Sequence, residues 1–171
     1  MYMKRFVLIL LVAVVLCKPF PVRATGLSVD IVDASYASVS TPSSTMDAVK
    51  FSFACQTATG VIGTENQQIY VHNDGGADNG WDVTLAAANA ANVWTSGGNT
   101  YDFNESAGNG CTTGQMTVNA SAGSLSTGQC SGCTVTGITK GDSASFTETN
   151  SVTILSGAAE SDNTGDWKLT G

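Results

Sequence analysis

The stretch IYVHNDGGADNGWDVTLAA, residues 69–87, decides the fold class that the sequence predicts. Apolar side chains alternate with polar ones at both of its ends, and Gly, Asp and Asn dominate its middle. Alternation with a period of two is typical of a strand with one buried face, and the Gly-rich middle is typical of a turn. The stretch SVTILSGAAESDNTGDWKLTG, residues 151–171, repeats this plan. Each stretch therefore predicts two strands joined by a polar turn, with a Trp near the start of the second strand.

The same alternation recurs outside these two stretches. It is found at residues 27–31, 49–55, 101–103 and 116–118 and around Val135, and turn-forming clusters such as TSGGNT and ESAGNG separate the runs. Many short strands at this spacing predict an all-β fold, an antiparallel two-sheet β-sandwich of the immunoglobulin-like type. The predicted core contains ten residues: Phe51, Phe53, Val71, Trp81, Val83, Leu85, Val152, Ile154, Trp167 and Leu169.

Residues 1–24 have the organisation of a secretory signal peptide. Two basic residues precede an apolar run that ends at Cys17, and small residues stand before a cleavage site after Ala24. The apolar run is shorter than the roughly 20 residues that a membrane-spanning helix needs, so we expect cleavage and no membrane span. Lipidation of Cys17 is the alternative, but Leu16 stands where a small residue would precede an acylated Cys. We therefore expect an exported protein in which residues 25–171 form a single domain.

Removal of this segment leaves a strongly acidic chain. Lys50, Lys140 and Lys168 are then the only Lys or Arg residues against 14 acids, which is a formal charge of −11. Such a surface repels nucleic acid and anionic lipid. The charge therefore argues against nucleic acid and membrane surfaces as partners.

Catalytic and metal-binding patterns are weak in this chain. His72 is the only histidine and is expected to be an exposed strand residue. No nucleophile elbow, phosphate-binding Gly loop or HExxH motif is present, so we predict a protein that is not an enzyme and has no cofactor. Asp74, Asp78 and Asp82 are weak candidates for calcium ligands, as are the acids of residues 160–166, because their spacing differs from that of an EF-hand loop.

Four Cys follow residue 24, and an even number favours disulfides in an exported protein. Three connectivities are open. CSGC at residues 130–133 has the spacing of a thiol–disulfide enzyme, but it stands in a Gly- and Ser-rich loop instead of at a helix N-terminus. We predict structural bonds that join Cys111 to Cys133 and Cys55 to Cys130. The first bond would restrain the long excursion between its two Cys and contribute about 3 kcal/mol.

The two Trp stretches resemble the WxL domain of bacterial surface proteins. In that family a hairpin with a G-W-x-(L/V) segment is followed, near the end, by a T-(I/V)-L strand and another W-x-L motif. The matching segments here are Gly80-Trp81-Asp82-Val83, Thr153-Ile154-Leu155 and Trp167-Lys168-Leu169, and the likeness covers roughly residues 60–171. The resemblance implies a cell-surface protein that associates with the peptidoglycan of the cell wall or with other surface proteins.

The sequence departs from that family in two ways. The first Trp segment reads W-D-V instead of the W-x-L that names the family, a conservative change, and nothing follows Gly171, where the family has a final hairpin. Either the segment Trp167–Leu169 is the terminal motif of a shortened domain, or the last strands are missing. In the second case the strand of Trp167 has an open edge that attracts another strand.

Trp81 and Trp167 are expected to fill the space between two sheets, as large aromatic residues do in sandwiches. Recognition of a ligand would then depend on exposed aromatic residues, and Trp94 and Tyr101 are the candidates. These two residues would also supply the flat platform of a secreted carbohydrate-binding module, which is one alternative function. The other alternative is a pilin-like subunit that assembles by strand addition, with residues 27–31 as the donor segment.

Overall fold

A computed structural model describes residues 26–74, 79–88, 93–96, 98–104, 114–146, 151–159 and 164–171. These residues form antiparallel strands and one short 3-10 turn, so the predicted all-β class is confirmed. No helix in these ranges is long and apolar enough to cross a membrane. The elements are β1 (Ser28–Val32), β2 (Gln68–Asn73), β3 (Trp81–Ala86), β4 (Val93–Ser96), β5 (Asn99–Asp102), β6 (Thr117–Asn119), η1 (Ala120–Ala122), β7 (Ser124–Thr127), β8 (Ile138–Lys140), β9 (Ser143–Ser145), β10 (Ser151–Gly157) and β11 (Gly165–Thr170).

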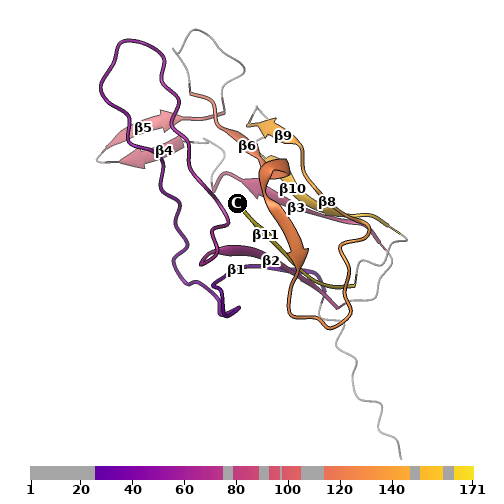
Figure 1. The fold of residues 1–171 in the computed structure, drawn as a ribbon. Coiled ribbons are helices and arrows are strands. Elements are labelled where there is room, and N and C mark those ends of the chain that lie inside the picture. The colour runs from indigo at the N-terminus through magenta and orange to yellow at the C-terminus, as the bar shows by residue number, and fades with distance from the viewer. Residues whose placement is uncertain are drawn as a thin grey trace, which may run out of the picture.

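Two sheets form the body of the molecule (Figure 1). The four-stranded sheet has the order β1-β2-β11-β7, and the three-stranded sheet has the order β3-β10-β8. Two smaller ladders, β4-β5 and β6-β9, accompany them. All pairings between the described strands are antiparallel, as the sandwich prediction requires.

Each Trp stretch crosses from one sheet to the other. The chain passes from β2 in the four-stranded sheet to β3 in the three-stranded sheet, and it returns from β10 to β11. Within the sheets β2 pairs with β11, where Val71 stands opposite Trp167, and β3 pairs with β10, where Trp81 stands opposite Gly157. The two predicted strands of each stretch are present, but they do not pair with each other as the strands of the hairpin implied by the WxL resemblance would. Each stretch is an arch that joins the two sheets, and in each sheet a strand of one arch pairs with a strand of the other.

The core lies between the two sheets and contains both Trp of the repeated motifs. The indoles of Trp81 and Trp167 come from opposite sheets, and their ring centroids are 5.6 Å apart. Trp167 is fully buried, and its Nε1 donates a hydrogen bond to the carbonyl oxygen of Thr134 over 2.8 Å. Trp81 is half-buried against the core. This contact between the sheets explains why the two stretches share a Trp.

Most of the predicted core is confirmed. Val71, Val83, Val152, Ile154 and Leu169 are buried, and Leu85 packs against them in a half-buried position. Phe103 and Phe146 complete the core, with their rings edge to face and centroids 5.3 Å apart.

The prediction for residues 49–55 is wrong. This segment forms no strand, and its side chains Phe51 and Phe53 are 88% and 97% exposed. Alternating residues form a strand only where a neighbouring edge accepts their backbone hydrogen bonds. The segment instead lies in a long loop between β1 and β2 that leaves the sheets (Figure 1). Val135, the other predicted strand centre outside any strand, is 42% exposed.

The open edge predicted beside Trp167 and Leu169 is also wrong. Their strand, β11, is an inner strand with β2 on one side and β7 on the other. The partner that the prediction missed is β7, whose sequence SLST carries a single large apolar residue. The edges of the four-stranded sheet are therefore β1 and β7.

Candidate functional site

The outer face of the four-stranded sheet carries aromatic and charged side chains. Alternate residues of a strand point to opposite faces, so the neighbours of the inward-pointing Trp167 point outward. In the register of β2 and β11, His72 stands opposite Asp166 and Tyr70 opposite Lys168. Strand pairing therefore gathers four functional groups that lie far apart in the sequence.

Tyr36 joins this face from the loop after β1. Its backbone N–H donates a hydrogen bond to the Asp33 carbonyl oxygen over 3.0 Å, and the Asp33 carboxylate accepts the N–H groups of Ser35 and Ala37. The Tyr36 φ of 65° lies in the left-handed region, where a bulky side chain is strained. Such strain persists only where surrounding contacts enforce it, and it clusters at functional sites.

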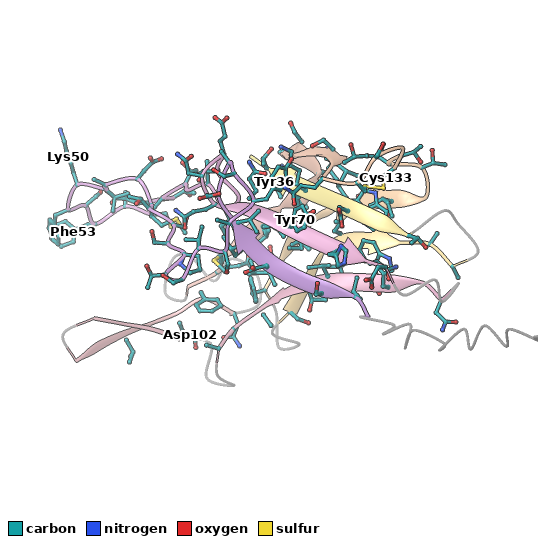
Figure 2. The ribbon with its side chains drawn as sticks, turned by 90° about the horizontal axis from the view of Figure 1, so that it is seen from below. Tyr36, Lys50, Phe53, Tyr70, Asp102 and Cys133 are labelled. Carbon is teal, nitrogen blue, oxygen red and sulfur yellow. A yellow bond between two sulfur atoms is a disulfide. The ribbon has the colours of Figure 1, made fainter. Side chains whose placement is uncertain are left out.

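The Tyr36 ring packs edge-on against Tyr70, with centroids 5.5 Å apart. The ammonium of Lys168 lies 5.5 Å from the centre of the Tyr36 ring, within the range of a cation–π contact. Figure 2 shows both Tyr side chains together on this side of the sheet. We call Tyr36 and Tyr70 the tyrosine pair.

Asp166 is the buried centre of a hydrogen-bond cluster at one end of this face. Its carboxylate is hydrogen-bonded to Nδ1 of His72, and the carboxylate of Asp74 lies 3.5 Å from Nε2 of His72. The nearby hydroxyl of Tyr70 accepts the backbone N–H of Gln129 over 3.4 Å. The hydrogen bond to Asp166 raises the pKa of His72 against the opposing effect of burial, and both carboxylates add to the rise. The pKa of Tyr70 is raised mainly by burial.

His72 is therefore half-buried and paired with carboxylates, whereas the sequence predicted an exposed residue. No local signal could have revealed the pair with Asp166, because the two residues are 94 positions apart and meet only through the strand register.

Beside the tyrosine pair the surface is hollowed into a shallow depression of ≈ 560 Å³, which we call the outer-face depression. Gln68 in its lining is buried; its Nε2 donates to the Glu65 carbonyl oxygen over 2.8 Å, while its Oε1 has no hydrogen-bond partner among the described residues. The depression is lined by Ala34, Gly63, Thr64, Glu65, Gln68, Ser126, Lys168, Thr170 and Gly171.

A disulfide lies next to the Asp166 cluster, and it joins Cys130 to Cys133. The predicted Cys111–Cys133 and Cys55–Cys130 bonds are therefore wrong. Gly132, with a φ of 82°, turns the CSGC loop back on itself and brings the two Cα atoms within 5.8 Å. Cys55 is also disulfide-bonded, to neither of these Cys, and Cys111 lies outside the described residues.

This disulfide packs on the start of β11. The backbone N–H of Asp166 donates to Sγ of Cys130 over 3.2 Å. At Gly165 a Cβ would lie 2.5 Å from Sγ of Cys133, so no larger residue fits without a shift. The CSGC loop thus helps to fix the strand that carries Asp166 and Lys168.

Of the other predicted site residues, only Asp74 is seen to contact this face. Trp94 and Tyr101 stand opposite each other in the β4-β5 pair, and their side chains lie outside the described part of the structure. Of the calcium candidates, Asp78 lies outside it as well, Asp74 contacts His72, and Asp82 accepts a hydrogen bond from the Ser156 hydroxyl over 2.6 Å. The described ranges hold no group of three or more His, Cys, Asp or Glu residues placed to bind a metal ion.

Comparison of the chain with models of protein families, with curated proteins and with solved structures gives no match. The outer face of the four-stranded sheet therefore has to be interpreted from its own geometry and chemistry.

Proposed function

We propose that the protein is a non-enzymatic, exported component of a bacterial cell surface that binds cell-wall polysaccharide through the outer-face depression. The observation that carries the proposal is the hollow lined by hydroxyl, amide, carboxylate and ammonium groups beside the tyrosine pair.

Polysaccharides present two kinds of surface, and this face has a counterpart for each. Sugar hydroxyls both donate and accept hydrogen bonds, and the hydroxyl groups of Ser126 and Thr170 in the lining do the same. The apolar C–H faces of sugar rings pack against aromatic side chains, which the tyrosine pair supplies. Concave sites with a few convergent polar groups are the usual form of ligand sites.

Lys168 connects the two parts of the site. Its side chain lines the outer-face depression, and its ammonium group lies over the ring of Tyr36. It is one of three Lys that remain after residue 24 in an otherwise acidic chain. A strongly anionic polymer would be repelled by the charge of −11, so a glycan of low charge density, such as the glycan strand of peptidoglycan, is the favoured ligand.

The location on a cell surface rests on the sequence. The signal-like residues 1–24 support export, and the resemblance to the WxL domain supports an association with the wall. Trp81 and Trp167, which carry that resemblance, fill the core. Recognition in this proposal is therefore assigned to the outer face and not to the motif residues.

The test is a pull-down of the purified exported chain with insoluble peptidoglycan and with isolated wall polysaccharide. We expect Lys168→Ala to reduce the bound fraction at least tenfold and Lys50→Ala, which removes the same charge from a distant loop, to leave it unchanged. Tyr36→Asn removes the ring at a backbone conformation that Asn tolerates, and it should weaken binding without unfolding the chain. Equal binding by the wild type and Lys168→Ala would contradict the proposal.

The pilin-like alternative has a specific obstacle. Residues 27–31, its donor segment, contribute to β1, which is paired with β2 of the same chain from Ser28–His72 to Val32–Gln68. Donation to another molecule would require β1 to leave this ladder. Assembly through this segment as a donor is thus less favourable than binding through a face that is already formed.

A further inference from the structure

The loop between β1 and β2 forms a projection with an apolar tip. Its two limbs are joined at the base by the bridge between Met46 and Gly60 and by a hydrogen bond from the Asp47 N–H to the Thr59 carbonyl oxygen over 2.7 Å. We call residues 46–60 the finger. Cys55, on its returning limb, is disulfide-bonded, which restrains the tip.

The tip of the finger exposes apolar side chains at every second position. Val49, Phe51 and Phe53 are 54%, 88% and 97% exposed, and the two Phe rings contact each other edge to face at 5.1 Å. Figure 2 shows Lys50 and Phe53 at the far end of the finger, away from the sheets. Exposed apolar side chains gathered in one place mark interaction sites in soluble proteins, whereas single ones do not.

An edge with the matching pattern exists elsewhere on the same molecule. β1 is an edge strand, and its second half is covered by the 37–39 segment through the Val39 N–H to Ile31 carbonyl bond of 2.8 Å and the Val32–Ser38 bridge. The first half, Ser28–Asp30, has no strand on that side among the described residues. Leu27 and Val29 are 41% and 48% exposed there, so this half of the edge is apolar and open.

We propose that the finger of one molecule adds as an antiparallel strand to the first half of β1 in a second copy of this chain. Residues 49–53 alternate in sequence between apolar and polar side chains and pair with no strand among the described residues, and residues 27–30 have a strand edge without a neighbour there. Strand addition satisfies the backbone groups of both segments.

One register brings all complementary side chains together. When Phe51 stands opposite Val29, Phe53 falls opposite Leu27, and both apolar pairs lie on one face. The same register places Lys50 opposite Asp30 on the other face. The Asp30 carboxylate is exposed, and its Oδ1 accepts bonds only from its own segment and Ser38 among the described residues, so it is reachable by a second molecule. Because Lys50 and Asp30 belong to the same sequence and have opposite charges, their pairing favours a second copy of this chain as the partner at the β1 edge.

The contact is of the head-to-tail type, because the finger and the β1 edge are different surfaces of one molecule. Each molecule that offers its finger keeps its own β1 edge open, so such contacts produce chains or rings instead of closed two-fold dimers. The paired segments are short, and interfaces of this size are weak and transient. Association should therefore depend strongly on protein concentration.

The test is sedimentation velocity of the exported chain over a wide concentration range, without polysaccharide. The wild type should shift from monomer to a distribution of oligomers as concentration rises. Phe51→Ser/Phe53→Ser should remain monomeric and melt at the temperature of the wild type, because neither ring is in the core. Persistent association of this variant, or a wild type that is monomeric at every concentration, would overturn the proposal.

Charge exchange tests the register separately. Asp30→Lys and Lys50→Asp should each weaken association at least fivefold, and the double variant should restore it, because the two charges then meet again with exchanged signs. Asp142→Lys, an equal change of charge at an exposed turn, is the matched control and should associate like the wild type. If the double variant stays monomeric, or both single variants associate normally, β1 is not the acceptor. None of these outcomes depends on the polysaccharide proposal.

Discussion

Gly157 determines where the indole of Trp81 lies. The two residues stand opposite each other in the β3-β10 pair, and a Cβ at Gly157 would lie 2.4 Å from Cε2 of the indole. The ring therefore occupies the space that any larger residue at this position would fill. The Trp in the first arch and the Gly in the second are matched across the ladder.

Gly157→Ala should consequently destabilise the fold by about 2–3 kcal/mol, because the added methyl group displaces Trp81 from its contact with Trp167. Urea denaturation followed by circular dichroism measures this change. Gly26→Ala is the matched control, since a Cβ there meets no atom within 4 Å. Equal stability of both variants would mean that Trp81 can move aside without cost.

His72→Gln tests the pair with Asp166 through its dependence on pH. The folded-state pKa of His72 is raised above its ordinary value of 6.5, so protonated His72 stabilises the fold. This stabilisation is complete below the unfolded pKa and is lost as pH rises through the folded pKa. The difference in unfolding free energy between wild type and variant should be largest in mildly acidic solution and shrink above neutral pH. A difference that grows with pH would contradict the proposed charge state.

Single residues show what sequence patterns cannot predict. The burial of Trp81, Trp167 and their aliphatic neighbours follows from alternation, because it is a local property of a strand. The strained backbone of Tyr36 and the pairing of His72 with Asp166 depend on chain segments that meet only in the folded molecule. Trp94 and Tyr101, the ligand contacts that the sequence suggests, are predicted from residue type alone.

Among the elements, the CSGC loop has an unusual position. It lies between β7 and β8, yet its contacts are with β11 through Gly165 and Asp166. The Trp167 indole also bonds to Thr134, the residue directly after Cys133. A disulfide that spans so few residues thus supports β11, an inner strand of the four-stranded sheet.

Replacing both Cys130 and Cys133 by Ser should lower the unfolding free energy by about 2 kcal/mol, which is the loop-closure contribution of so short a ring. It should also change the fluorescence of Trp167, whose hydrogen-bond partner lies beside the loop. Urea titration with fluorescence detection measures both effects. Peptide mapping of the non-reduced wild type should recover Cys130 bonded to Cys133, and a peptide that joins Cys111 to Cys133 would contradict the assignment.

Elements differ in how well their sequences predict them. β2, β3, β10 and β11 alternate strongly and bury one face, and the sequence predicts all four. Apolar and polar residues alternate as clearly in residues 49–55, but no strand edge lies beside them and they form no strand. The alternation in β7 is weak, yet β7 is a strand because its backbone pairs with β11. The availability of a partner edge, which is a property of the fold, decides these cases.

For the whole molecule, the sequence predicts the class but not the topology. Periodicity shows that strands form and which side chains face inward, so the two-sheet body follows. Periodicity does not show which strand belongs to which sheet, because a polar turn of the same composition can connect the two strands of a hairpin or the two strands of an arch. The residues of the outer face form a candidate site only because β2 and β11 lie side by side in the fold.

The interleaved arches also have a consequence for the time course of folding. The last two strands among the described residues, β10 and β11, are inner strands of the two sheets, so neither sheet can pair completely until they are present. Strands such as β2 and β11 must close a loop of about a hundred residues, and such long-range pairing is slow. A chain that emerges from the ribosome N-terminus first would remain without this core until β10 and β11 have emerged. In the export that we propose, compact folding too early would block translocation, and this order of assembly would delay it.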